Sequence, residues 1–161
     1  MKSPAFAIAI SLAAFPALAQ NAAQIDRVRG GANCPHCNLF QAELSNVTLK
    51  GRSYAGSRLR QADLSLSVFN HSDFAGADLR DVNGYGALFT NANFAHANMT
   101  NSTFVGAYLE GANFRGATLV GVNFSGAEMD TAVGLTQGQL NGACGDPTTK
   151  LPHGVRLPIC K

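Results

Sequence analysis

The sequence predicts an all-β solenoid with four sides to each coil. Three observations lead to this prediction. A five-residue period runs from Cys37 to Thr131 without insertion or deletion, a large apolar residue lies at the centre of almost every unit, and a small residue precedes it by two positions. A period of five fits neither the helical repeat of about 3.6 nor the strand repeat of about two. It fits a chain that turns a corner every five residues.

The repeat fills 19 consecutive units, or 95 residues. The central residue is large and apolar in 18 of them, with Gly84 as the exception, and the upstream residue is small in 18, with Arg52 as the exception. Four sides make a 20-residue coil, and coils joined by backbone hydrogen bonds stack about 4.8 Å apart. Nineteen units therefore predict nearly five coils and a rod of about 23 Å.

Central residues twenty apart are expected to stack inside the rod. One column is aromatic, with Tyr54, Phe74, Phe94 and Phe114, and another holds Leu39, Leu59, Leu79, Met99 and Leu119. At Arg52 we expect a distorted corner that lets the guanidinium reach water. At Gly84 we expect a cavity or bulge into which Tyr85 turns.

Residues 1–19 have the pattern of a cleavable signal peptide. Lys2 supplies a positive charge, Ala5–Phe15 is apolar, and Ala17-Leu18-Ala19 is a small-residue cleavage site before Gln20. Eleven apolar residues are too few for a membrane span, which needs about 20. We therefore expect an exported chain without a membrane span after cleavage, located in the periplasm or secreted, where disulfides form.

Segments on both sides of the repeat are expected to cap the rod, because a solenoid exposes unpaired backbone at its ends. In the N-terminal cap, residues 20–36, Asn21 and Gln24 have capping-box spacing and begin a short helix. In the C-terminal segment, residues 132–161, Thr136 and Gln139 have the same spacing. That second helix is expected to run to about Cys144, with an extended tail after it.

The two cysteines of the C-terminal segment are expected to form a disulfide. Cys144 and Cys160 would tie the tail back to the cap helix, and closing such a loop contributes about 3 kcal/mol. Pairing with a cysteine of the other end is disfavoured, because the rod separates the two pairs by more than the roughly 7 Å that a disulfide allows.

The segment Cys34-Pro35-His36-Cys37 is the one cluster that suggests chemistry. C-P-H-C resembles the active-site dithiol of periplasmic thiol oxidants, in which the first cysteine lies at a helix N-terminus. The thioredoxin-like context of that motif is absent here, because the five-residue register begins at Cys37. A local structural disulfide, two packed cysteines, or a metal site with Cys34, His36 and Cys37 as ligands are the other interpretations.

The charges nearly cancel, since 12 Lys and Arg face 10 Asp and Glu. The repeat region itself carries eight acidic and six basic residues. This balance argues against a nucleic-acid partner. The sequence has no Ser-His-Asp spacing, phosphate loop or acid–base pair, so we predict no catalytic residues and no cofactor.

The units, such as A-D-L-S-L from Ala62, resemble the A-(D/N)-L-x-x pattern of the pentapeptide-repeat family. The resemblance implies a right-handed quadrilateral β-helix. Some members of this family mimic duplex DNA and engage type II topoisomerases. That role needs an acidic surface and a cytoplasmic address, and this chain is predicted to have neither.

These observations predict a non-catalytic exported structural or interaction scaffold. A protein partner is expected without being identified, and an end-to-end dimer is not favoured. The alternative is a thiol–disulfide exchange or metal-binding protein that uses the cysteines of the C-P-H-C segment.

Overall fold

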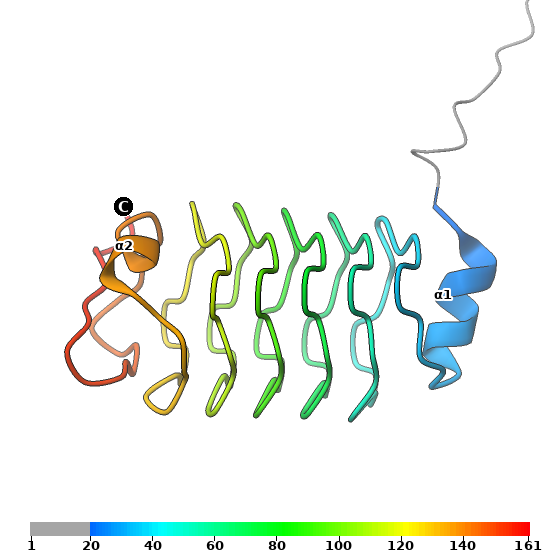
Figure 1. Cartoon of the computed structure of the whole chain (residues 1–161), viewed down its shortest axis with the longest axis horizontal. Helices are drawn as coiled ribbons and strands as arrows, with labels where there is room; N and C mark the ends of the chain where they lie inside the picture. The colour runs from blue at the N-terminus through cyan, green and yellow to red at the C-terminus, as the bar shows by residue number, and fades with distance from the viewer. Residues whose placement is uncertain (1–19) are drawn as a thin grey trace, which may run out of the picture.

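The computed structural model describes residues 20–161 as a rod of stacked coils closed by a helix at each end (Figure 1). Helix α1 (Ala22–Arg29) covers one end and the short helix α2 (Gln137–Leu140) lies at the other. The predicted signal peptide, residues 1–19, lies outside the described residues. Among residues 20–161, no helix has the length and apolar character needed to cross a membrane.

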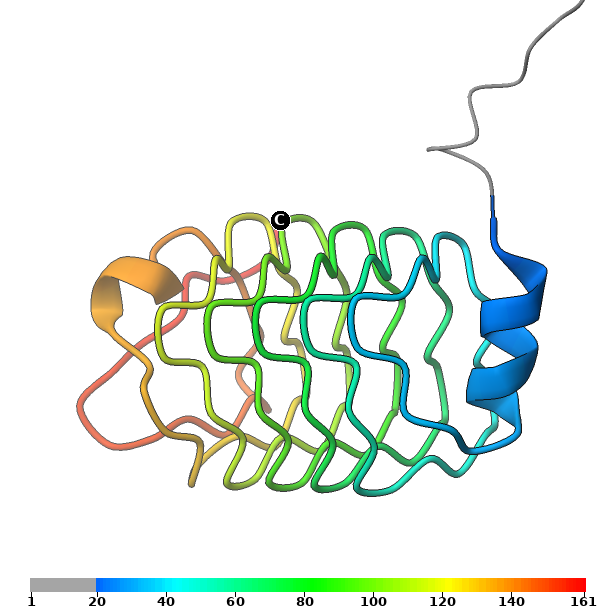
Figure 2. The same ribbon diagram turned by 45° about the vertical axis from the view of Figure 1, so that its right-hand side comes forward.

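Parallel backbone bridges between residues twenty apart join each coil to the next. They run from Asn38↔Arg58 to Asn113↔Val133. In a typical step, the Arg58 N–H donates to the Cys37 carbonyl at 2.8 Å, and the Leu39 N–H donates to the Arg58 carbonyl at 2.8 Å. Each coil therefore has four five-residue sides, which are visible as the repeating turns in Figure 2. The predicted right-handed quadrilateral β-helix is confirmed.

The backbone conformation at the corners explains why glycine is frequent at the last position of the five-residue unit. All 19 residues from His36 to Gly126 in steps of five have a positive φ, and nine of them are glycine. A Cβ disfavours this left-handed region, which Gly, Asn, Asp and His tolerate best. Leu66 is the least suited of the remaining corner residues, with a φ of 56°.

The central residues fill the interior in columns. The Tyr54, Phe74, Phe94 and Phe114 rings stack with successive centroid separations of 5.1, 5.4 and 5.4 Å. A second column places Phe69 over Phe89 at 5.5 Å, edge-on to the first. The aliphatic column of Leu39, Leu59, Leu79, Met99 and Leu119 is also buried. Side chains from every coil thus make one continuous core.

The structure corrects the expectation at Gly84. The Gly84 N–H donates to the Thr103 carbonyl at 2.7 Å, as in a regular coil, and Tyr85 is 53% exposed. A Cβ on Gly84 would lie 2.8 Å from the Phe104 ring. The ring from the next coil therefore occupies the space, so neither a bulge nor an inward Tyr85 is needed. At Arg52 the side chain is exposed, as expected, but the predicted distortion is wrong. The Arg52 carbonyl accepts from the Asp73 N–H at 2.8 Å as in a regular coil, and the Gly51 φ of 66° is like that of the other corners.

The repeat begins one unit earlier than predicted. Cys34 is buried like a central residue, its N–H donates to the Ser53 carbonyl at 2.9 Å, and His36 has the positive φ of a corner. Residues 32–36 therefore belong to the first coil, and the N-terminal cap ends before them. The cap itself is α1, whose Asn21 side chain accepts from the Gln24 N–H.

Residues after α2 also differ from the prediction. Helix α2 ends at Leu140, and its Thr136–Gln139 capping box is complete. Cys144 is not helical, because its N–H donates to the Val122 carbonyl and its carbonyl accepts from the Phe124 N–H. The bridges Asn123↔Cys144 and Glu128↔Lys150 are offset by 21 and 22 residues. The C-terminal segment thus adds part of a further coil, and its ladder hydrogen bonds replace the predicted last helical turn.

Candidate functional site

The C-P-H-C segment is a turn of the first coil. A disulfide joins Cys34 and Cys37, whose Cα atoms are 5.4 Å apart, and the two side chains are 1% and 8% exposed. The Cys37 N–H donates to the Ser57 hydroxyl oxygen at 3.1 Å, and that hydroxyl donates to the Cys34 carbonyl at 2.6 Å. The next coil therefore holds this segment from below.

This geometry differs from that of a thiol oxidant. The segment begins no helix, so Cys34 lacks the helix N-terminus that stabilises a thiolate in those enzymes. Neither sulfur is free to act as a thiolate metal ligand while the disulfide is formed. The His36 ring lies against the next corner, since a Cβ on Gly56 would be 2.5 Å from its Nδ1 atom. The disulfide is therefore shielded from solvent within the first coil.

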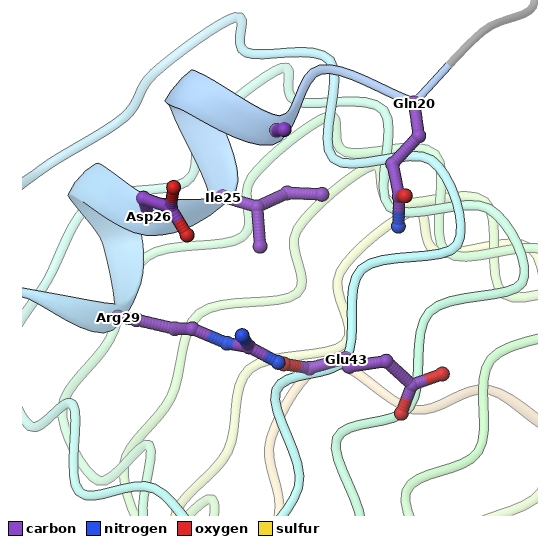
Figure 3. A pocket seen from close by; sticks show the side chains of 6 residues that line it. Gln20, Ile25, Asp26, Arg29 and Glu43 are labelled. Atoms are coloured by element: carbon purple, nitrogen blue, oxygen red, sulfur yellow. The ribbon is translucent and has the colours of Figure 1, made fainter.

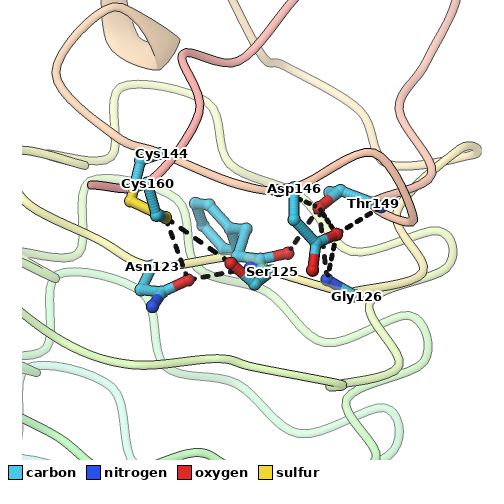
Figure 4. Close-up of a disulfide and its surroundings, with 8 residues drawn as sticks. Asn123, Ser125, Gly126, Cys144, Asp146, Thr149 and Cys160 are labelled. Carbon is cyan, nitrogen blue, oxygen red and sulfur yellow. Dashed lines mark hydrogen bonds between the residues drawn. A yellow bond between two sulfur atoms is a disulfide. The ribbon is translucent and has the colours of Figure 1, made fainter.

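The second disulfide joins the C-terminal tail to the last coil. Cys144 and Cys160 have Cα atoms 4.9 Å apart, and the Cys160 N–H donates to the Gly145 carbonyl at 2.9 Å. Both cysteines are half-buried beside Asn123 and Ser125 (Figure 4). This bridge is therefore more accessible than the first.

Asp146 organises the loop that follows Cys144. Its carboxylate accepts from the N–H groups of Gly126 and Thr149, both at 3.1 Å (Figure 4). It also accepts from the Thr148 N–H at 2.9 Å. Hydrogen bonding, above all from the Thr148 hydroxyl, lowers the pKa of Asp146. The ionised carboxylate therefore connects this loop to the coil beneath it.

At the other end, α1 and the first coil enclose a groove of about 200 Å³ (Figure 3). Its lining residues are Gln20, Ala22, Ile25, Asp26, Arg29 and Glu43. The Arg29 Nε–H donates to the Glu43 carbonyl at 2.9 Å, and the Gln20 side chain donates to the Gln41 carbonyl at 2.8 Å. Gln24 also accepts from the Asn38 N–H at 2.7 Å. These side chains satisfy the backbone edge of the first coil, so the groove is a consequence of capping.

Charged residues gather on one side of the second and third coils. Arg80 pairs with Asp78 at 2.6 Å, and Arg60 pairs with Asp81 at 3.3 Å. The hydrogen bond from Arg80 lowers the pKa of Asp78. The Arg58 guanidinium lies 4.5 Å from the centre of the Phe40 ring. In these contacts basic side chains of this side are paired with neighbouring carboxylates or lie over an aromatic ring.

Two histidines lie on the surface of the coils, away from the C-P-H-C segment. His71 and His96 occupy exposed corners of different columns. Within residues 20–161, no three His, Cys, Asp or Glu side chains are placed to hold a metal ion.

One surface feature was missed in the sequence. Val68, Leu88 and Tyr108 lie twenty apart in an outward position that is usually polar, and bridges join them in one row. Writing the chain in rows of twenty would have revealed this apolar row.

The sequence profile of the pentapeptide repeats matches eight copies, in residues 55–83 and 87–126. The matched copies lie within the coils described above. The chain is a pentapeptide-repeat protein. The two matched stretches are separated at Gly84, the one unit without a large central residue. The pentapeptide coils extend beyond the matched stretches on both sides.

Solved structures of other pentapeptide-repeat proteins are similar to this chain. A thylakoid-lumen protein of Arabidopsis thaliana, AT2G44920, is 24% identical over 68% of this chain and 61% of its own, with a TM-score of 0.31. The plasmid-mediated fluoroquinolone resistance protein QnrB1 is 21% identical over 76% of this chain and 63% of its own, with a TM-score of 0.42.

A third structure, Rfr23 from the cyanobacterium Cyanothece 51142, is 20% identical over 80% of this chain and 97% of its own, with a TM-score of 0.35. The pentapeptide-repeat chain described here spans only about three fifths of the first two structures. A comparison with curated proteins finds no match.

Proposed function

We propose that this pentapeptide-repeat protein is an exported, non-catalytic scaffold that presents its outward faces to a protein partner. The observation that carries the proposal is that the described residues build the coils and close their ends. Its interior is filled by stacked apolar side chains, and its cysteines close the two ends of the rod as disulfides. A rod of this kind offers a rigid surface with regularly spaced side chains, which suits binding better than chemistry.

Two disulfides support the export part of the proposal. Structural disulfides persist in oxidising compartments and are rare in the cytosol. The signal-peptide pattern before Gln20 points to the same compartment. The chain is therefore proposed to act in the periplasm or outside the cell.

The burial of the Cys34–Cys37 bridge favours a structural role over thiol exchange. Exchange requires a thiolate to reach one sulfur in line with the disulfide, and side chains that are 1% and 8% exposed oppose that approach. We propose that this bridge fixes the first coil.

Mass spectrometry of the protein isolated from an expressing bacterium tests the proposal. We expect a mature N-terminus at Gln20, recovery in the envelope or medium, and both disulfides formed without free thiol. A full-length cytoplasmic chain with reduced cysteines would refute the exported scaffold.

An insulin-reduction assay tests the non-catalytic part. The wild type is expected to match a Cys34→Ala/Cys37→Ala variant, with the Cys144→Ala/Cys160→Ala variant as the matched control. Turnover that disappears only in the first variant would support thiol exchange instead.

A further inference from the structure

The third side of each coil forms a flat face with an apolar centre. We define the apolar face by its outward residues in five successive coils, which are Thr48, Lys50, Val68, Asn70, Leu88, Thr90, Tyr108, Glu110, Glu128 and Asp130. Tyr108 is 43% exposed, and Val68 and Leu88 are half-buried, with part of each side chain open to solvent. The adjoining corner residue Leu66 is 55% exposed and extends the apolar surface.

The borders of this face leave the centre accessible. On one side the corners of the last three coils are Gly86, Gly106 and Gly126, which have no side chain to stand above the surface. On the other border the corners Gly51 and Gly111 are also glycine, whereas His71 and Asn91 are the exposed corners of the second and third coils. Flat β-faces with apolar centres pack against each other about 10 Å apart. The face is therefore shaped for another flat surface.

Charge is distributed unequally along the face. Lys50 is exposed at the first coil, whereas Glu110, Glu128 and Asp130 lie at the fourth and fifth coils. The Lys150 ammonium joins the acidic end, where it pairs with Glu128 at 3.1 Å. Glu110 and Asp130 lie twenty residues apart on this side of adjacent coils, and together with Glu128, which has the largest effect, they raise the pKa of Lys150. One end of the face is basic and the other has a net negative charge.

This distribution of charge is complementary to that of a second copy turned end to end. Leu88 lies in the middle coil, with Lys50 two coils before it and Asp130 two coils after it. Consider two copies that face each other, with a two-fold axis passing between their Leu88 side chains. This axis would place Lys50 of one copy opposite the acidic end of its partner, twice in each dimer. It would also place Val68 opposite Tyr108 of the partner subunit. Isologous interfaces require this kind of self-complementarity.

We propose that the apolar face is the interface of an antiparallel, side-by-side homodimer. The five coils of one face span only about 19 Å between their first and last rows, so the buried area lies in the range of weak, reversible interfaces. The dimer therefore depends on protein concentration. This inference is independent of the compartment and of any partner of the scaffold.

Sedimentation velocity of the purified chain tests the dimer over protein concentrations from about 1 µM to about 1 mM. The wild type is expected to shift from one to two copies within that range. Leu88→Glu places two carboxylates at the dyad and should leave a monomer throughout. Thr118→Glu, an exposed substitution on another side, should dimerise like the wild type. Thermal unfolding of each variant checks that the coils remain intact.

Charge reversal tests the antiparallel arrangement. Lys50→Glu and the pair Glu110→Lys/Asp130→Lys should each weaken dimerisation by about tenfold. All three substitutions in one chain should restore it to within about threefold, because the reversed charges meet again across the dyad.

Three results would overturn the proposal. The first is a wild type that stays monomeric at every concentration, including one whose apolar face binds a different protein. The second is a dimer that Leu88→Glu does not weaken, which would place the interface elsewhere, for example at the ends of the rod. The third is a triple variant that fails to recover, which would exclude the antiparallel arrangement.

Discussion

The two ends of the rod cover their unpaired backbone groups in different ways. At the N-terminal end, α1 lies over the first coil, and the nearby disulfide closes a separation of only three residues inside that coil. At the C-terminal end, α2 is half as long, and a disulfide across 16 residues ties an extended tail to the last coil. The N-terminal end is closed by local structure, and the C-terminal end by a long-range bond.

The two ends are therefore expected to differ in their sensitivity to mutation. Satisfying the edge of a ladder with a helix depends on a few side chains, here Gln20, Gln24 and Arg29. Satisfying it with a tail that re-enters the ladder depends on register, because the insertions shift the pairing by one and then two residues. We expect the C-terminal end to be the more sensitive of the two.

We expect the greatest loss of stability at the glycines where each end meets the coils. A Cβ on Gly134, whose φ is +76°, would lie 2.6 Å from the Arg115 backbone nitrogen. Gly31, with a φ of +84°, has only the Arg52 guanidinium nearby, at 3.8 Å. Gly134→Ala should therefore lower the free energy of unfolding by more than about 3 kcal/mol, and Gly31→Ala by about 1–2 kcal/mol. Urea unfolding measures both, and equal losses would remove the proposed asymmetry.

The second prediction concerns the two disulfides, which should differ in how easily they are reduced. Replacing Cys144 and Cys160 by alanine should cost about 3 kcal/mol, mainly through the entropy of the longer loop in the unfolded chain. Under mild reductant, this half-exposed bridge should also open well before the buried Cys34–Cys37 bridge. Timed alkylation followed by peptide mapping gives the order. Opening of the N-terminal bridge first would contradict the burial argument.

A smaller gain is expected at Tyr54, near the N-terminal end. Its hydroxyl is buried without a hydrogen-bond partner, and burial raises its pKa so that it stays protonated. An unpaired buried hydroxyl costs about 1–3 kcal/mol. Tyr54→Phe should therefore stabilise the protein by about 1 kcal/mol, with Tyr85→Phe at an exposed position as the neutral control. Destabilisation by Tyr54→Phe would show that the hydroxyl has a partner.

The smallest effect should appear in acid. Hydrogen bonds lower the pKa of Asp146 in the folded chain, so its contribution is present above the unfolded pKa and is lost as pH falls through the folded value. The loop of residues 146–150 should then exchange amide hydrogens faster below about pH 4, while α1 changes less. Asp146→Asn should remove this pH dependence, and an unchanged profile in that variant would contradict the role assigned to the carboxylate.

The regular part of the molecule could be predicted from the sequence because its contacts repeat. Residues twenty apart meet in every coil, so the period alone places Phe74 over Phe94 and assigns the corners. Cys34 lies five residues before Leu39, in the same register, so extending the period back by one unit places it at a central position. The space at Gly84 is filled by Phe104, twenty residues later, and a column must be read as a whole to see this.

The C-terminal end could not be predicted in the same way. The Thr136–Gln139 capping box is a local signal and was found, but the helix stops at Leu140 because Gly142 and Cys144 bond to the coil beneath them. Those bonds depend on insertions that erase the five-residue period. The outward faces carry no signal of their own partner, so the binding role stays a proposal.

The stacked aromatic column is the most direct test of the 20-residue coil. In an NMR spectrum with labelled phenylalanine rings, the centroid separations of 5.4 Å predict strong cross-relaxation between Phe74 and Phe94 and between Phe94 and Phe114. Phe74 and Phe114 should show no direct contact. Contacts between that last pair, or the absence of both predicted contacts, would contradict the coil register on which this account rests.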